Sequence, residues 1–189
     1  LVGSEMCIRD SPNICNYIHL PVQSGSNAVL KAMNRQHTRE EYMALIDDIK
    51  RLLPNCGISQ DMIAGFPNET EQDHKDTLSL MEYVTYDFGF MFMYSERPGT
   101  PAAKKLEANI PDDVKKRRLQ EIVDLQQKHG RIRNDQQLGK TIEVLIEKTS
   151  KRSDQQWSGR AQQNTVVVFP KDAYKIGDFV SVKIDSCTS

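Results

Sequence analysis

The sequence predicts an α/β domain with a parallel sheet, followed by a small β-barrel. Up to about residue 94, β-branched or aromatic runs alternate with segments of helical period. This strand–helix–strand order favours right-handed crossovers and a parallel sheet. A long polar segment of residues 111–137 has the character of a helix, and short alternating stretches punctuated by Gly and Pro follow Gly139. Short strands at this spacing are typical of a small barrel.

The first half of the α/β domain contains two strands and two helices. We expect the first strand over residues 16–22, where the run stops at a Gly/Ser turn, and a short helix over residues 26–34. A longer helix begins at Thr38, because Thr38 and Glu41 fit a capping box in which the carboxylate reaches back to the cap amide. The second strand covers residues 58–64.

The remaining elements follow from similar signals. Thr70 begins the next helix, with Asp73 at its third position. Residues 87–94 are almost continuously apolar, which is typical of a buried parallel strand, and residues 95–101 form a Pro/Gly loop. The helix of residues 111–137 connects the two parts. The expected barrel strands lie at residues 142–146, 165–169 and 179–184.

Composition excludes several classes of protein. The 189 residues, 38% hydrophobic and 27% charged, allow one domain and a small second one. No apolar run approaches the roughly 18 residues that a membrane span needs. A net charge of −1 excludes nucleic-acid binding by bulk charge alone, although residues 138–189 are mildly basic. The cysteines, Cys7, Cys15, Cys56 and Cys187, form no CxxC or CxxxCxxC motif, which excludes a sequence-local metal or cluster site.

Residues 1–11, LVGSEMCIRDS, have neither a helical nor a strand period. They lack the basic start and apolar core of a signal peptide. We interpret them as a non-native leader, the alternative being a genuine disordered leader. The predicted division of the chain is then the leader, an α/β part over residues 12–108, a connecting helix over residues 109–137 and the barrel over residues 138–189.

Three loops follow the three predicted strands, at residues 23–26, 64–69 and 95–100. Because the carboxyl ends of parallel strands meet at one edge of the sheet, these loops form a potential ligand-binding rim. Small residues there let a ligand approach the backbone, and polar side chains can orient it. The alternative is ordinary turn chemistry, since Gly, Ser and Pro occur in any such loop.

Each candidate in these loops has a structural alternative. Gln23 and Ser24 either contact a ligand or form a helix-capping network. Asp61 lies inside a strand, so its charge needs either a ligand hydroxyl or a structural salt bridge as partner. Glu69 either takes part in the site or caps the helix that follows. Arg97 either holds a carboxylate or phosphate in a bidentate fork or pins its loop.

The histidines and cysteines have plainer interpretations. We expect His19 to be a satisfied core residue, His37, His74 and His129 to lie on the surface, and Cys15 and Cys56 to be ordinary thiols. The chain contains no GxSxG, HExxH or P-loop motif and no complete catalytic set.

Several segments resemble a known family. The stretch HLPVQSGSNAVLKAMNRQHTREEY (residues 19–42) resembles the second half of radical S-adenosylmethionine (SAM) enzymes, and more narrowly the MiaB family of tRNA methylthiotransferases. The segments ISQDMIAGFPNETEQD (58–73) and FMFMYSERPGTPAA (90–103) agree. The barrel segment WSGRAQQNTVVVF (157–169) resembles a TRAM domain, an OB-like tRNA-binding module.

The resemblance implies a fold and a reaction. Residues 12–108 would be the C-terminal half of a radical SAM partial (β/α) barrel, and residues 138–189 a TRAM barrel. The reaction would be methylthiolation of C2 of N6-isopentenyladenosine at tRNA position 37. It would use SAM and two 4Fe–4S clusters, but the cysteine motifs that hold the clusters in the family are absent here. We therefore assign no catalytic or metal-ligating residue and expect a fragment that is inactive alone.

The resemblance also assigns binding residues, by position in the motifs. Those near SAM are Gln23, Ser24, Gly25, Asp61, Ile63, Gly65 and Arg97. Those expected to contact tRNA are Lys151, Arg152, Trp157, Arg160 and Asn164. Trp157 would stack on a base, the alternative being packing in the core or a turn.

The expected partners are the tRNA anticodon stem-loop and an electron donor for cluster reduction. We expect a cytoplasmic monomer that does not bind a membrane. Two alternatives stay open: a related radical SAM methylthiotransferase acting on another tRNA base or a ribosomal protein, and a non-catalytic RNA-binding fragment.

Overall fold

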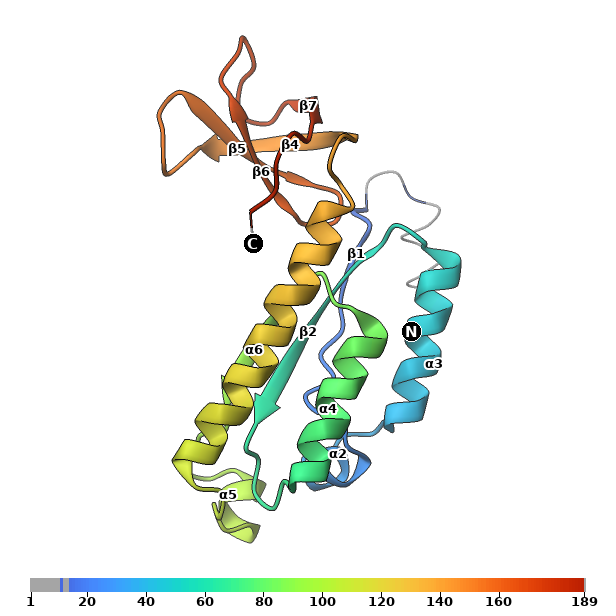
Figure 1. The fold of residues 1–189 in the computed structure, drawn as a ribbon, viewed down its shortest axis with the longest axis vertical. Coiled ribbons are helices and arrows are strands. Elements are labelled where there is room, and N and C mark those ends of the chain that lie inside the picture. The colour runs from blue at the N-terminus through green and yellow to red at the C-terminus, as the bar shows by residue number, and fades with distance from the viewer. Residues whose placement is uncertain (1–10, 12–13, 189) are drawn as a thin grey trace. The chain divides into compact units, whose positions relative to one another are not determined.

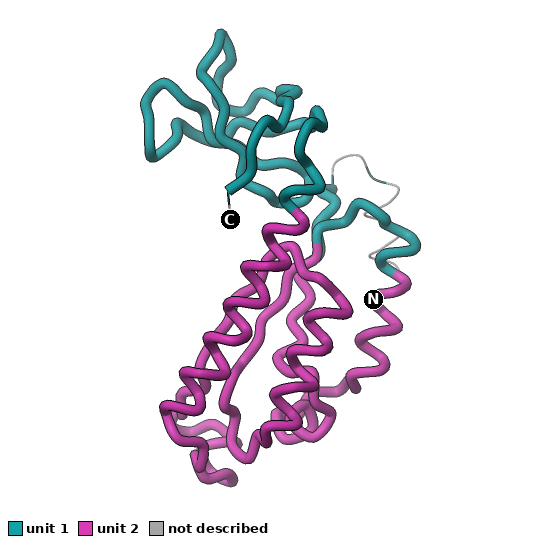
Figure 2. The backbone as a smooth tube through the Cα atoms, viewed as in Figure 1, with its two compact units in different colours: residues 1–18, 49–57, 134–189 teal, residues 19–48, 58–133 magenta. Residues whose placement is uncertain are grey.

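A computed structural model describes residue 11 and residues 14–188 of the chain. Apart from Ser11, the predicted leader lies outside the described residues, and so does Cys7. The chain divides into two compact units (Figure 2), each described by itself below. The α/β unit comprises residues 19–48 and 58–133, and the β unit comprises residues 1–18, 49–57 and 134–189.

The α/β unit is organised around a three-stranded sheet of order β1-β2-β3. Figure 1 labels two of these strands, β1 and β2. Its strands are β1 (Tyr17–His19), β2 (Gly57–Ala64) and β3 (Phe88–Met93). β2 and β3 are parallel, with Asp61 opposite Phe90 and Ile63 opposite Phe92. The expected parallel sheet is therefore confirmed, although β1 is shorter than its hydrophobic run.

Five helices accompany the sheet in the described part of the chain. They are α2 (Asn27–Ala32), α3 (Arg39–Leu52), α4 (Glu71–Val84), α5 (Pro101–Lys105) and α6 (Asp112–Asp135). The predicted capping box of Thr38 and Glu41 is present. The Thr38 N–H donates to the Glu41 carboxylate over 2.8 Å, and the Glu41 N–H donates to the Thr38 hydroxyl over 3.2 Å. Thr70 forms a second capping box with Asp73 at the start of α4. The short helix α5 was not predicted.

The expectation that β3 is buried on both faces is wrong. Phe88, Phe90 and Phe92 are 50%, 50% and 51% exposed. Only the opposite face is covered: a Cβ added to Gly89 would meet the side chains of Gln60 and Gln126, the latter on α6. Since successive residues of a strand point to opposite faces, the three phenylalanines lie on a face that no described helix covers.

α6 packs against the sheet although its sequence is polar. One side of the helix buries Lys115, Arg118, Ile122, Gln126 and His129, spaced three or four residues apart. The expected surface positions of His74 and His129 are wrong, because these side chains are only 1% and 5% exposed. The His74 Nε2 atom lies 2.6 Å from the Glu121 carboxylate of α6, which joins α4 to α6.

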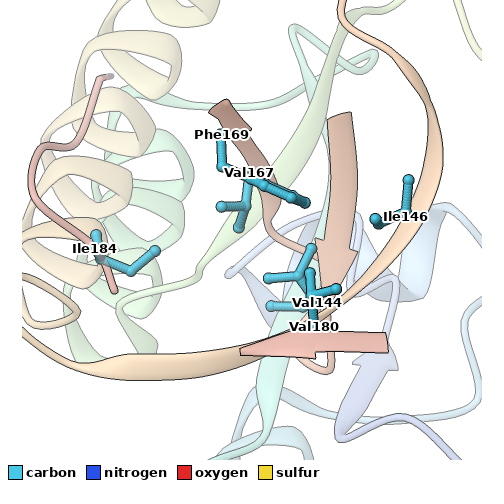
Figure 3. Packing of buried hydrophobic residues seen from close by; sticks show 7 residues of the cluster. Val144, Ile146, Val167, Phe169, Val180 and Ile184 are labelled. Carbon is cyan, nitrogen blue, oxygen red and sulfur yellow. The ribbon is translucent and has the colours of Figure 1, made fainter. Parts of the chain in front are cut away.

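The β unit contains a four-stranded antiparallel sheet of order β6-β5-β4-β7. The strands are β4 (Thr141–Thr149), β5 (Gln156–Ala161), β6 (Val166–Pro170) and β7 (Phe179–Lys183). One side of the sheet carries a single apolar core (Figure 3), which consists of Val144, Ile146, Ala161, Val167, Phe169, Val180 and Ile184. An irregularity in the β4–β5 register after Ile146 bends the sheet around this core.

None of the described helices combines the length and the apolar character that crossing a membrane requires.

Candidate functional site

Three of the predicted SAM-site residues meet at the carboxyl end of the sheet. Gln23 has a left-handed backbone, with φ of 77°, and it pairs with β2 in the parallel direction. Its N–H donates to the Asp61 carbonyl over 2.9 Å, and its carbonyl accepts the Ile63 N–H over 3.0 Å. Gln23 therefore continues the strand pairing of β1 and fixes its own position against Asp61 and Ile63.

The Ser24–Gly25 loop is attached to the middle of α4. The Ser24 and Thr77 hydroxyls are 3.2 Å apart, and the Gly25 N–H donates to the Thr77 hydroxyl over 2.9 Å. A Cβ on Gly25 would overlap the carbonyl of Asp76, so only glycine fits there. Ser24 is 1% exposed. These bonds give Ser24 and Gly25 structural partners and determine the shape of the loop, while the N-cap of the following helix α2 is Ser26.

Asp61 has a protein partner on the open face of the sheet. The His19 Nε2 atom lies 3.5 Å from its carboxylate, and the His19 Nδ1 atom lies 2.7 Å from the Ser59 hydroxyl. The His19 ring meets Phe90 edge to face, with centroids 6.2 Å apart. With its side chain 37% exposed, His19 is not the core residue that the sequence predicts. Its strand is apolar, but its own side chain lies on the uncovered face.

Gly65 and Glu69 shape the second loop. Gly65 has φ of +74°, and its N–H donates to both oxygens of the Glu69 carboxylate, at 3.1 and 3.2 Å. Arg118 of α6 donates to the same carboxylate over 2.9 Å, and the two side chains are only 3% and 5% exposed. Burial raises the pKa of Glu69, while the Gly65 amide and Arg118 act in the opposite direction.

The structure corrects the role of Glu69. Thr70, not Glu69, is the N-cap of α4, and the Glu69 carboxylate instead closes its own loop. The sequence did not predict that Arg118 takes part in this loop. Its partner Glu69 lies 49 residues away in the chain, and the helix that contains Arg118 has a polar sequence. Lys115 also covers this loop, since a Cβ on Gly65 would overlap the Lys115 side chain.

Arg97 lies exposed in the loop between β3 and α5. Its carbonyl accepts hydrogen bonds from the Thr100 N–H at 3.2 Å and the Thr100 hydroxyl at 2.9 Å. Thr100 in turn caps α5. The backbone of Arg97 thus pins the loop and leaves its guanidinium at the surface.

The described residues do not supply ligands for a metal cluster. No three His, Cys, Asp or Glu side chains within the described ranges are arranged to hold a metal ion. The described cysteines, Cys15, Cys56 and Cys187, are free thiols, exposed, buried and intermediate respectively. An iron–sulfur cluster therefore has no fitting ligand set in this part of the chain.

Two of the predicted RNA-contacting residues bind each other. The Arg160 Nη1 atom donates to the Asn164 backbone carbonyl over 3.1 Å and to its side-chain oxygen over 2.6 Å. The Arg160 Nε atom lies 3.3 Å from the Glu147 carboxylate. Asn164, with φ of 65°, is the left-handed residue of the β5–β6 turn. Arg160 is therefore held in place but stays partly exposed.

Trp157 packs on the inside of the β unit. Its ring contacts the apolar core, and the Lys171 Nζ atom lies 4.4 Å from the ring centroid. This favours the packing alternative for Trp157. Lys151 and Arg152 lie exposed in the β4–β5 loop, and the Arg152 N–H donates to the Ser150 hydroxyl over 3.3 Å.

Comparisons with known families match both parts of the chain. The radical SAM superfamily matches residues 8–81, and the TRAM domain matches residues 135–189. A similar solved structure is the radical SAM enzyme coproporphyrinogen III oxidase (HemN) of Escherichia coli, with a TM-score of 0.53 and 16% identity over 78% of this chain and 41% of that chain. At this identity the likeness shows the fold alone.

Curated relatives are far more similar in sequence. The tRNA-2-methylthio-N(6)-dimethylallyladenosine synthase of Christiangramia forsetii is 69% identical over 94% of this chain, and that of Flavobacterium johnsoniae is 66% identical over the same share. The chain spans 37% of the length of each of these relatives. The Bacteroides fragilis synthase is 53% identical over 96% of the chain. This identity runs through both units, so the chain is similar to these synthases over nearly its whole length.

Proposed function

We propose that this chain belongs to an enzyme that methylthiolates C2 of N6-isopentenyladenosine at position 37 of tRNA by a radical SAM mechanism. The observation that carries the proposal is the 69% identity to a synthase of that name over 94% of the chain. Because the chain spans 37% of that relative, the activity is proposed for the protein that contains these residues. The chain alone has no cluster ligand set among its described residues.

In this proposal SAM lies against the uncovered face of the sheet, at its carboxyl end. Asp61 and Ile63 are partly exposed there, so the carboxylate can accept a ligand hydroxyl and the isoleucine can contact a base. Two loops beside Asp61 and Ile63 are shaped by Gln23, Ser24, Gly25 and Gly65. The third loop supplies a surface cation, Arg97. SAM, when cleaved reductively by a 4Fe–4S cluster, supplies an adenosyl radical.

The β unit provides the RNA contact in this proposal. Lys151, Arg152 and Arg160 would contact phosphates of the anticodon stem-loop, and Asn164 holds Arg160 in position. The whole enzyme would contain two 4Fe–4S clusters, need an electron donor for cluster reduction, and work as a cytoplasmic monomer.

A chimera tests the proposed function. Residues 14–188 would replace the matching part of the Flavobacterium johnsoniae synthase in a strain that lacks its own enzyme. We expect mass spectrometry of digested tRNA to show the 2-methylthio nucleoside. An Asp61→Ala chimera should lose the mark, whereas an Asp154→Ala chimera, altered at an exposed loop residue of the β unit, should keep it.

The outcome separates the alternatives. Restored methylthiolation of a ribosomal protein with unmodified tRNA would favour the related-enzyme alternative. A soluble chimera that restores neither mark would contradict the proposal.

A further inference from the structure

The β unit exposes an aromatic side chain that the sequence did not single out. Trp157 and Phe169 lie against the core, while Tyr174 and Phe179 are 48% and 65% exposed. Phe179, the first residue of β7, has the highest exposure of the large apolar side chains that the structure describes. A ring with this exposure contributes little to the fold of its own unit.

Phe179 lies at one end of a row that crosses the whole sheet. The strand register places it opposite Leu145, Leu145 opposite Arg160, and Arg160 opposite Val166. Val166, at the other end, is 55% exposed. The sequence neighbours of these residues belong to the core on the other side of the sheet. The four residues therefore share the outer face, and we call them the outer stripe.

Hydrogen bonds hold the backbone before Phe179 and the side chain of Arg160 in place. The Ile146 N–H donates to the Asp178 carbonyl over 2.9 Å, and the Gly177 N–H donates to the Ile146 carbonyl over 2.9 Å, which ties the residues before Phe179 to β4. Arg160 is held by Asn164 and Glu147, as described above. A strand end with a fixed backbone and a guanidinium with a fixed position lose little conformational entropy when they bind a partner.

The charges near the stripe favour an anionic partner. Lys183 lies on the same face of β7 as Phe179, and Lys151 and Arg152 are exposed in the β4–β5 loop. The outer face also carries Glu143, and Glu147 is already paired with Arg160. An exposed ring on the same sheet face as a guanidinium and a lysine matches an unpaired nucleobase with its phosphates, because bases stack on aromatic rings and cations contact the backbone.

We propose that the outer stripe binds an unpaired nucleobase of RNA, with Phe179 as the stacking ring. The inference rests on the proposed function, because it identifies how the β unit would hold the anticodon loop. It replaces Trp157, whose ring packs inward against the core, as the residue that stacks on a base.

The test measures RNA binding by the chain itself. A fluorescein-labelled, unmodified anticodon stem-loop hairpin and a fully paired RNA duplex of the same length are titrated by fluorescence anisotropy. Phe179→Leu removes the ring and keeps an apolar side chain. Tyr83→Leu also removes an aromatic ring, at a 41% exposed position of α4, together with a hydroxyl that donates to Asp47, and it serves as the control.

We expect Phe179→Leu to weaken hairpin binding about 5- to 150-fold, the effect of losing one stacked base. The dependence of affinity on salt should stay unchanged, because the variant keeps every phosphate-contacting cation. Tyr83→Leu should bind the hairpin with the affinity of the unaltered chain. The affinity for the paired duplex should be the same for all three proteins. Emission of Trp157, the one tryptophan, should change little on binding.

Three results would overturn the inference. The first is hairpin binding by Phe179→Leu that equals that of the unaltered chain. The second is strong quenching of Trp157 by the hairpin, combined with normal affinity of Phe179→Leu. The third is a dimer in sedimentation that Phe179→Leu dissociates without any change in RNA affinity, which would make the stripe a self-association surface. If the unaltered chain does not bind the hairpin, the proposed RNA contact of the β unit fails as well, whereas the chimera tests the reaction independently.

Discussion

Removing the guanidinium of Arg118 should destabilise the α/β unit strongly. In the variant Arg118→Met the Glu69 carboxylate keeps only the Gly65 N–H as a hydrogen-bond donor, in a site where its side chain is 3% exposed. Breaking a buried ion pair by removing one partner costs about 3–5 kcal/mol, a large share of the roughly 5–15 kcal/mol that stabilises a domain. The accompanying contact of Arg118 with Glu71 adds little, because the Glu71 side chain is 49% exposed.

The stability that Arg118→Met loses should depend on pH, in a direction set by the pKa of Glu69. Burial raises the pKa of Glu69, and without Arg118 the pKa of this carboxyl rises further. A folded-state pKa above the unfolded one means that protonation favours the folded protein. The variant should therefore regain stability as pH falls through the raised pKa of Glu69. The difference between the variant and the unaltered chain should be smaller at about pH 5 than at about pH 7.5.

Urea unfolding followed by two signals measures this effect. Far-UV circular dichroism reports the helices, which lie mostly in the α/β unit, while emission of Trp157 reports the β unit. Only the helix transition should move to lower urea. The double variant Arg118→Met/Glu69→Gln should recover most of the loss, because a neutral amide oxygen can still accept the Gly65 N–H. If Arg118→Met lowers the free energy of unfolding by less than about 1 kcal/mol at neutral pH, or by the same amount at both pH values, the reasoning is refuted.

Three further predictions concern single side chains of the α/β unit. Gly65→Ala should cost about 1–3 kcal/mol in urea unfolding, because φ is positive and the new methyl group would overlap Lys115; an unchanged midpoint would contradict this. Asp73→Ala should cost about 1 kcal/mol at neutral pH. Burial raises the pKa of Asp73, but hydrogen bonds, including those from Thr70, lower it overall, so this stabilisation should disappear as acid protonates the carboxylate. Phe90→Thr should reduce self-association in sedimentation velocity, since Phe90 is 50% exposed on an uncovered sheet face.

Local signals in the sequence predicted the elements well. The Thr38–Glu41 capping box and the helix start at Thr70 formed as expected, because each depends on residues only three positions apart. The alternating residues of the barrel also lie in strands, with Val144 and Ile146 in the core. These features are determined within one turn of helix or one strand, so periodicity alone is sufficient to find them.

Burial could not be predicted where it depends on distant parts of the chain. His74 and Arg118 are polar residues of amphipathic helices, and they are buried because each finds a charged partner on another element. The phenylalanines of β3 show the reverse case. Their apolar run has the composition of a strand covered on both faces, but α6 covers only the side of Gly89. A sequence pattern records hydrophobicity and does not record which face has a neighbour.

The two interpretations of the Ser24 loop prove to be compatible. Hydrogen bonds to Thr77 use the Ser24 hydroxyl and the Gly25 backbone N–H, two groups that a ligand would otherwise contact, and Gly25 lies close to α4. The same bonds fix the backbone beside Asp61, the partly exposed carboxylate at this edge of the sheet. A loop held in this way needs no rearrangement when a ligand binds, so a structural network can itself serve binding. The pair formed by Arg160 and Asn164 follows the same logic in the β unit, because a cation whose position is already fixed loses less entropy on meeting a phosphate.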